Sequence, residues 1–65
     1  MKLKDMLRNF YSDLPIKVKK GLFGILVESV ACDDLYLKDE YSYLRNSEVD
    51  SVYVSRFGKV VITIK

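Results

Sequence analysis

The chain has no histidine and no tryptophan, and its 65 residues include one cysteine, one proline and three glycines. Without histidine, Cys32 has no usual base to activate it, and a zinc site of the ordinary Cys/His kind cannot form. With no second cysteine, an intrachain disulfide is excluded. There is also no glycine-rich loop of the kind that cradles phosphates. We therefore expect no enzyme activity, no metal and no cofactor, and we look for the function in what the surface binds.

The chain is long enough for a single domain, residues 1–65, with a thin core. Chains near 60 residues bury only about 60% of the surface that their unfolded form exposes. Hydrophobic residues make up 49% of the chain and charged residues 31%, which is typical of a folded protein. Small cores are often supported by a metal, a disulfide or a partner subunit. Since the first two are excluded, we predict a homodimer.

Charge and hydropathy give little sign of a membrane or of strong attraction to nucleic acid. The formal net charge is only +2, so the overall field is weak. The first seven residues alternate between charged and apolar, unlike a signal peptide, and no apolar run approaches the roughly 20 residues of a membrane span. With a single thiol as well, we expect a cytoplasmic protein.

Two stretches have the apolar spacing of amphipathic helices. The apolar spacing of the first stretch runs from Leu3 to Leu14. The helix itself should end near Ser12 or Asp13, because Pro15 cannot continue a helix. The second should begin at an N-cap provided by Asp33 or Asp34 and break around residues 45–47. Its buried face should carry Leu37, Tyr41 and Leu44.

Period-two patterns between and after these helices predict strands at residues 16–19, 22–31, 49–55 and 60–64. The order is helix, hairpin, helix, hairpin (αββαββ). It predicts an α+β fold with a four-stranded antiparallel sheet and two helices on one face. Leu3–Asp5 and Leu37–Asp39 have the same sequence, so an internal duplication of a helix–hairpin unit is an alternative that we leave open.

The strands carry more apolar side chains than one sheet face can hold. We assign one set to the core: Phe23, Ile25, Val27, Val52, Val54, Ile62 and Ile64. Leu22, Leu26, Val30, Tyr53 and Val61 alternate away from that set, and an apolar outer face is typical of an interface. We predict a dimer interface of Leu22, Leu26, Val30 and Val61. The alternative is a β-bulge, which would turn some of these residues inward and leave no patch.

Tyrosine is the other unusual feature, with five copies. Tyrosine and arginine are enriched in the residues that contribute most to protein interfaces. The partner-binding site predicted on this basis is Tyr36, Glu40, Tyr43, Arg45 and Tyr53. For Tyr36 and Tyr43 an equal alternative is partial burial with a hydrated hydroxyl group.

The candidate phosphate contacts are Lys17, Lys19 and Lys20. We favour the alternative that they form a solvated face or protect an exposed strand edge, because no basic stripe with interleaved aromatic residues accompanies them.

Several segments resemble a known group of proteins. They are the opening Met1–Leu7, the run Asp34–Leu37, the stretch Tyr43–Val54 and the closing Val60–Ile64. Together they are similar to small uncharacterised proteins encoded by phages and prophages of Gram-positive bacteria. The resemblance implies a viral accessory protein of the host cytoplasm. That group includes stoichiometric inhibitors of defence systems, such as anti-CRISPR proteins that act on effector nucleases.

Three functions follow as hypotheses. The leading one is a dimeric phage-type binding protein that occupies a surface of a host protein, such as a defence nuclease. The second is a nucleic-acid-binding accessory protein that uses the lysine strand and the first helix. The third is a dimeric sponge whose groove, lined by Tyr36, Tyr43 and Arg45, sequesters a nucleotide signal.

Overall fold

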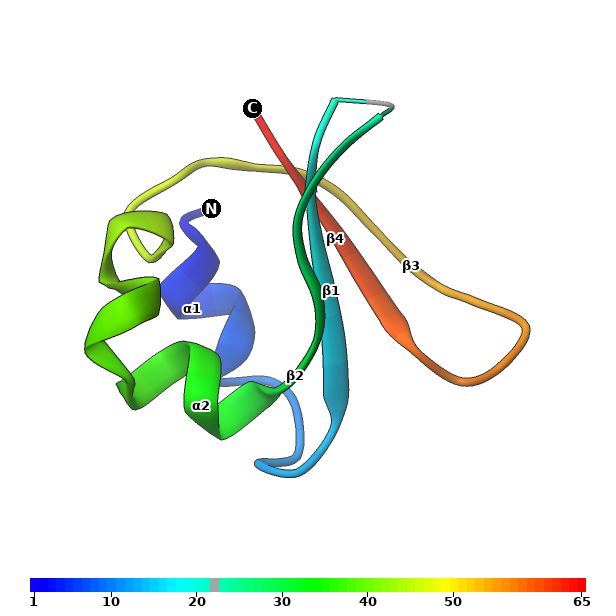
Figure 1. Cartoon of the computed structure of the whole chain (residues 1–65), viewed down its shortest axis with the longest axis horizontal. Helices are drawn as coiled ribbons and strands as arrows, with labels where there is room; N and C mark the ends of the chain where they lie inside the picture. The colour runs from blue at the N-terminus through cyan, green and yellow to red at the C-terminus, as the bar shows by residue number, and fades with distance from the viewer. Residues whose placement is uncertain (22) are drawn as a thin grey trace.

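Three short helices lie against one face of a four-stranded mixed sheet in a computed structural model that describes residues 1–21 and 23–65 (Figure 1). This arrangement is an α+β fold. The elements are the α-helices α1 (Leu3–Leu7) and α2 (Cys32–Leu37), the 3-10 helix η1 (Asp39–Leu44), and the strands β1 (Pro15–Lys20), β2 (Gly24–Ala31), β3 (Val49–Val54) and β4 (Val60–Ile64).

The strand order is β2-β1-β4-β3, and the two central strands run parallel. The two hairpins, β1–β2 and β3–β4, are antiparallel, but β1 and β4 are parallel, so the prediction of a wholly antiparallel sheet is wrong. The chain crosses from one hairpin to the other through α2 and η1, which brings the first strand of one hairpin beside the second strand of the other. A symmetric duplication would require the two halves of the chain to occupy equivalent places in the sheet. In this strand order they do not.

The first helix is much shorter than predicted, because the residues that follow Leu7 form a loop that bonds to the start of α2. The backbone N–H groups of Asn9 and Phe10 turn back to Met6 and Leu7. The carbonyl groups of Leu14 and Ser12 then accept hydrogen bonds of 2.9 Å from the backbone N–H groups of Cys32 and Asp33. Free N–H groups at the start of α2 are thus satisfied by backbone, and the N-cap is Ala31 rather than Asp33 or Asp34.

The predicted second helix is two helices, because Lys38 adopts an extended conformation between α2 and η1. This break changes which side chains face the sheet. Leu35 and Leu44 are buried, Tyr41 is partly buried and Leu37 is exposed. The predicted buried face is therefore correct at Leu44 and wrong at Leu37.

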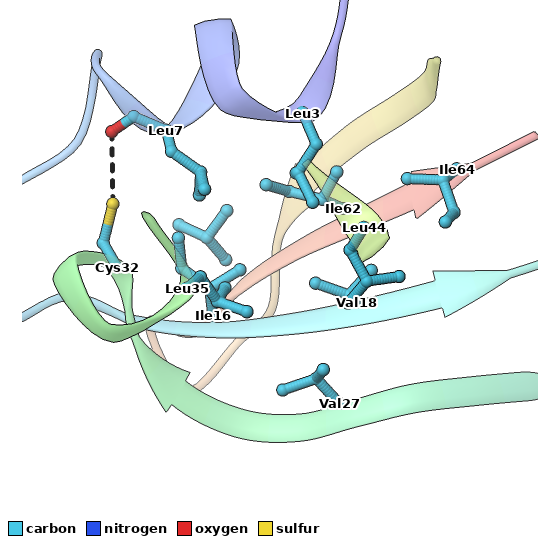
Figure 2. Packing of buried hydrophobic residues seen from close by; sticks show 11 residues of the cluster. Leu3, Leu7, Ile16, Val18, Val27, Cys32, Leu35, Leu44, Ile62 and Ile64 are labelled. Atoms are coloured by element: carbon cyan, nitrogen blue, oxygen red, sulfur yellow. Dashed lines mark hydrogen bonds between the residues drawn. The ribbon is translucent and has the colours of Figure 1, made fainter. Parts of the chain in front are cut away.

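The core lies between the helices and the two central strands (Figure 2). Ile16 and Val18 of β1 and Ile62 of β4 are fully buried, and Leu3 and Leu7 of α1 pack over them. The other buried hydrophobic members of this cluster are Val27, Cys32, Leu35, Leu44, Val60 and Ile64. The helices thus cover the centre of the sheet and leave its two sides less protected.

Four residues that the sequence assigns to the core are exposed instead. They are Phe23, Ile25, Val52 and Val54. Phe23 lies in the turn before β2, and two register shifts along β2 change the phase that places Ile25. Val52 and Val54 share a sheet face with Ile62 and Val60, but β3 lies beyond the cover of the helices (Figure 1).

The predicted outer-face interface does not form one patch. Val30 is partly buried against the core, and Val61 is only 3% exposed, so neither side chain has much surface for a partner. Val61 lies in register between Lys17 and Tyr53, whose long side chains can cover it. Leu26 is exposed, and Leu22 lies outside the described residues. A strand with β-bulges therefore describes β2 better than the regular alternation that predicted the interface.

Candidate binding surfaces

The predicted partner-binding residues lie on two different sides of the molecule. Tyr36 is on α2, and Glu40 and Tyr43 are exposed on η1. Tyr53 is on β3 and in register with Val61, which is outside the core cluster, so Tyr53 faces away from the helices. A partner with a flat surface cannot contact the helical residues and Tyr53 at once.

Arg45 supports the fold through its guanidinium group. Its Nε donates a hydrogen bond of 3.0 Å to the carbonyl of Leu35, and a terminal nitrogen donates to the carbonyl of Lys38. These carbonyls lie at the end of α2, where a helix leaves acceptors unpaired. The predicted partner contact is therefore occupied by contacts within the chain.

Tyr36 belongs to a small pocket between α1 and α2. The pocket measures about 250 Å³ and is lined by Leu7, Arg8, Phe10, Ser12, Cys32, Asp33 and Tyr36. Arg8 Nε donates to the Tyr36 hydroxyl at 3.1 Å, and its guanidinium carbon lies 5.9 Å from the centre of that ring. The hydrogen bond to Tyr36 raises the pKa of Arg8. Tyr36 thus shares a pocket with Arg8, and neither Tyr43 nor Arg45 of the predicted nucleotide groove lines it.

The thiol of Cys32 at this pocket is buried and forms a hydrogen bond within the fold. Its Sγ donates a hydrogen bond of 3.1 Å to the carbonyl of Leu7 (Figure 2). Burial raises the pKa of the Cys32 thiol, and the neighbouring charge of Asp33 raises it further. A raised pKa lowers the fraction of thiolate, which is the nucleophilic form. Cys32 therefore acts as a packing residue that joins α1 to α2.

The three predicted phosphate contacts are not gathered into one basic surface. Lys17 Nζ lies 3.6 Å from a carboxylate oxygen of Glu28. Lys19 borders a shallow hollow on the outer sheet face that Asp50 also lines. Lys20 is in register with the core residue Ile64 and so belongs to the opposite face. An acidic neighbour therefore offsets Lys17, and Lys19 and Lys20 lie on opposite faces of the sheet.

An exposed apolar surface lies beside the unpaired edge of β3. Val52, Tyr53 and Val54 are exposed, the last by 66%, and Phe57 in the following turn is 89% exposed. We call these four residues the β3 surface. Alternation assigned Val52 and Val54 to the core, so the sequence did not predict this surface. Three consecutive apolar residues in a strand, Val52 to Val54, are the signal that both faces are apolar.

The open edge of β3 also presents unpaired backbone groups. Ser55 N–H donates to the carbonyl of Lys59 across the hairpin at 2.8 Å. In an antiparallel pair, hydrogen-bonding residues alternate along the strand. Tyr53 therefore bonds toward β4, while the N–H and C=O groups of Val52 and Val54 point to the open edge.

The chain itself covers only the first part of this edge. Val49 N–H donates to the carbonyl of Met1 at 2.8 Å, and Leu3 N–H donates to the carbonyl of Ser47 at 2.9 Å. The amino group of Met1 also lies 3.1 Å from the carboxylate of Glu48 and lowers the pKa of that group. Residues 1–3 thus pair beside 47–49, and residues 51–54 stay open.

The edge on the other side of the sheet is less suited to pairing with another strand. Strand β2 has two register shifts along its length, whereas β3 pairs regularly with β4 from Ser51 to Val54. Irregular edges resist the addition of another strand, and flat edges accept it. The two edges of this sheet therefore differ in regularity, and β3 has the longer stretch of regular pairing.

Comparisons with known proteins identified no relative of this chain. A scan against protein-family models found no match, and searches of curated proteins and of solved structures also found none. In the part of the chain that the structure describes, no helix has the length and apolar character needed to cross a membrane.

Proposed function

We propose that this chain is a small non-enzymatic protein that acts by stoichiometric binding to a protein partner, and that the β3 surface makes the contact. The observation that supports the proposal is the coincidence of exposed apolar side chains with an open, regular strand edge. Such an edge is a template on which an extended segment of another chain can add as a further strand.

Strand addition uses both kinds of group found at this edge. The outward N–H and C=O groups of Val52 and Val54 give main-chain hydrogen bonds, and the side chains give selectivity. Complete burial of a valine or phenylalanine side chain contributes about 1.5–3 kcal/mol. Val54 and Phe57 are mostly exposed, so they offer the largest gain on contact with a partner.

The resemblance to phage and prophage accessory proteins favours a host protein as the partner, with a defence nuclease as one target. No comparison links the chain to that group, so the resemblance stays a prediction. The cytoplasm is the compartment in which such a target would be met.

Replacing Val54 with lysine tests the proposed surface. Lysine adds charge and length at a position that is already exposed, so the fold should persist while the edge is blocked. The matched control is Leu37→Lys, at a residue of similar exposure on α2. In a capture experiment from nuclease-treated bacterial lysate, we expect Val54→Lys to reduce stoichiometric retention of a protein about tenfold, which corresponds to ~1.4 kcal/mol. Leu37→Lys should retain the partner.

Two outcomes would contradict the proposal. If Leu37→Lys loses the partner and Val54→Lys keeps it, the contact is on the helical layer. If untreated lysate yields only nucleic acid, with retention that falls steeply as salt is added, the chain is a nucleic-acid-binding protein.

A further inference from the structure

We infer that the strand that pairs with the β3 edge comes from a second copy of this chain, antiparallel to the first and related by a two-fold axis at Tyr53. The inference rests on the proposed function, because it uses the same strand edge: the second copy pairs there in the free protein, and a host protein competes with it for that edge. The pairing would join two four-stranded sheets into one continuous sheet with both helical layers on the same side.

The directions of the backbone groups select the register. Because Val52 and Val54 point outward, these two residues must form the hydrogen-bonded pairs. Placing Tyr53 opposite Tyr53 of the second copy sets Val52 opposite Val54 of the second copy, on both sides of the axis. Every outward group of these valines then has a partner, and the two Tyr53 residues form the non-hydrogen-bonded pair between them.

Apolar side chains then meet on both faces of the new sheet. Val52 and Val54 share the face that carries the core, so the valines of both copies form one cluster there. Tyr53 lies on the opposite face, where the two rings flank the axis. Aromatic and β-branched cross-strand pairs stabilise a sheet, and here each pair buries surface that the single copy exposes.

The charges along the hairpin favour a second copy over an unrelated strand. Glu48 and Asp50 lie at the start of β3, and Arg56 and Lys59 follow its end. Antiparallel self-pairing brings the acidic start of each copy to the basic end of the other, twice in the dimer. Asp50 and Arg56 are both exposed, and neither forms an ion pair with any residue that the structure describes. A parallel pairing would instead place like charges together.

The open length of the edge fits this register. Residues 1–3 cover the edge beside 47–49, so a second copy has residues 51–54 available. With the axis at Tyr53, the backbone pairing runs from Ser51 to Ser55, and Asp50 and Arg56 lie one residue beyond its ends. The copies therefore meet without displacing the contacts of Met1 and Leu3.

Sedimentation equilibrium of the purified full chain tests the inference, with a charge swap as the specific variant. We expect a concentration-dependent dimer. Asp50→Arg should raise its dissociation constant at least about tenfold, because it places two arginine side chains against each other at both ends of the interface. Adding Arg56→Asp in the same chain should return the constant to within about threefold of the starting value, since the double change again pairs opposite charges. Circular dichroism of each variant checks that the fold is kept.

A single introduced cysteine tests the register. Cα atoms of a non-hydrogen-bonded antiparallel pair lie about 4.5 Å apart, which a disulfide can span. Tyr53→Cys should therefore form a covalent dimer under mild oxidation, and Leu37→Cys, on α2, should not. An equimolar mixture of Val52→Cys and Val54→Cys proteins should give the mixed dimer in preference to either homodimer.

The outcomes separate this inference from the proposed function. A chain that stays monomeric up to millimolar concentration, while Val54→Lys still reduces capture of another protein, overturns the second-copy inference and leaves the function in place. A monomer that captures no protein overturns both. A dimer in which Leu37→Cys cross-links and Tyr53→Cys does not would place the interface on the helical layer.

Discussion

Replacing Ile62 with alanine should lower the free energy of unfolding by about 3 kcal/mol. Ile62 is fully buried at the centre of the sheet, in register with Val18 on one side and Val52 on the other. Removing a buried isoleucine side chain costs about 2–5 kcal/mol, from lost transfer energy and the cavity left behind. Natural domains have only about 5–15 kcal/mol of stability in total. Urea denaturation followed by circular dichroism measures the change.

The control is the same substitution at Ile25, which alternation assigned to the same core face as Ile62. Ile25 is 49% exposed, so Ile25→Ala should cost less than about 1 kcal/mol. Equal losses at the two sites would mean that β2 does not have the register shifts described above.

Replacing Arg45 with alanine should lower the free energy of unfolding by about 1.5–3 kcal/mol, the range for hydrogen bonds to charged groups. The guanidinium group donates to the carbonyls of Leu35 and Lys38. Without it, the end of α2 loses its donor, and the break at Lys38 loses the contact that connects it to the end of η1. Thermal or urea unfolding of the purified variant gives the measurement.

Arg45→Lys separates geometry from charge. Lysine keeps the positive charge but lacks the planar fork that reaches two carbonyls at once, so it should recover only part of the loss. A loss below about 0.5 kcal/mol for Arg45→Ala would show that the guanidinium contacts do not stabilise the helical layer, and Arg45 would return to the candidates for partner binding.

The sequence predicts the strands better than the helices. Pro15 and the alternation of Ile16 and Val18 with lysines mark β1, and Val60 to Ile64 marks β4, because buried strands carry dense β-branched runs. The helices are shorter than the stretches of helical periodicity that predicted them. The carbonyls of Ser12 and Leu14 bond to the start of α2, and Lys38 breaks the second stretch. These are tertiary contacts, which local spacing does not record.

The parallel pairing of β1 with β4 could not be read from the chain either. Both hairpins are local, but the way they meet depends on the path through α2 and η1. An alternating strand gives the same pattern beside a parallel or an antiparallel neighbour. A β-bulge was one alternative offered by the excess of apolar residues, but alternation alone does not locate the register shifts of β2, which account for the misplaced Ile25.

The candidate site was predicted only in part. Tyr53 was selected for its residue type and lies on the β3 surface. Tyr36 and Arg45 were selected for the same reason, yet both make hydrogen bonds within the fold. Residue type favours an interface but does not say which side chains the fold itself uses. Val52 and Val54 were missed because an edge strand without cover has the same alternation as a covered one, and Phe57 was missed because it lies in the turn, where alternation makes no assignment.

The most direct test of an open binding edge on β3 is amide hydrogen exchange, followed residue by residue as the protein concentration is raised. We predict that the amides of Val52 and Val54 exchange quickly in dilute solution and become protected as pairing occurs, while the amide of Tyr53, bonded to β4, is protected throughout. Rates for Val52 and Val54 that are already slow in dilute solution, or that do not change with concentration or on addition of a captured partner, would contradict the account.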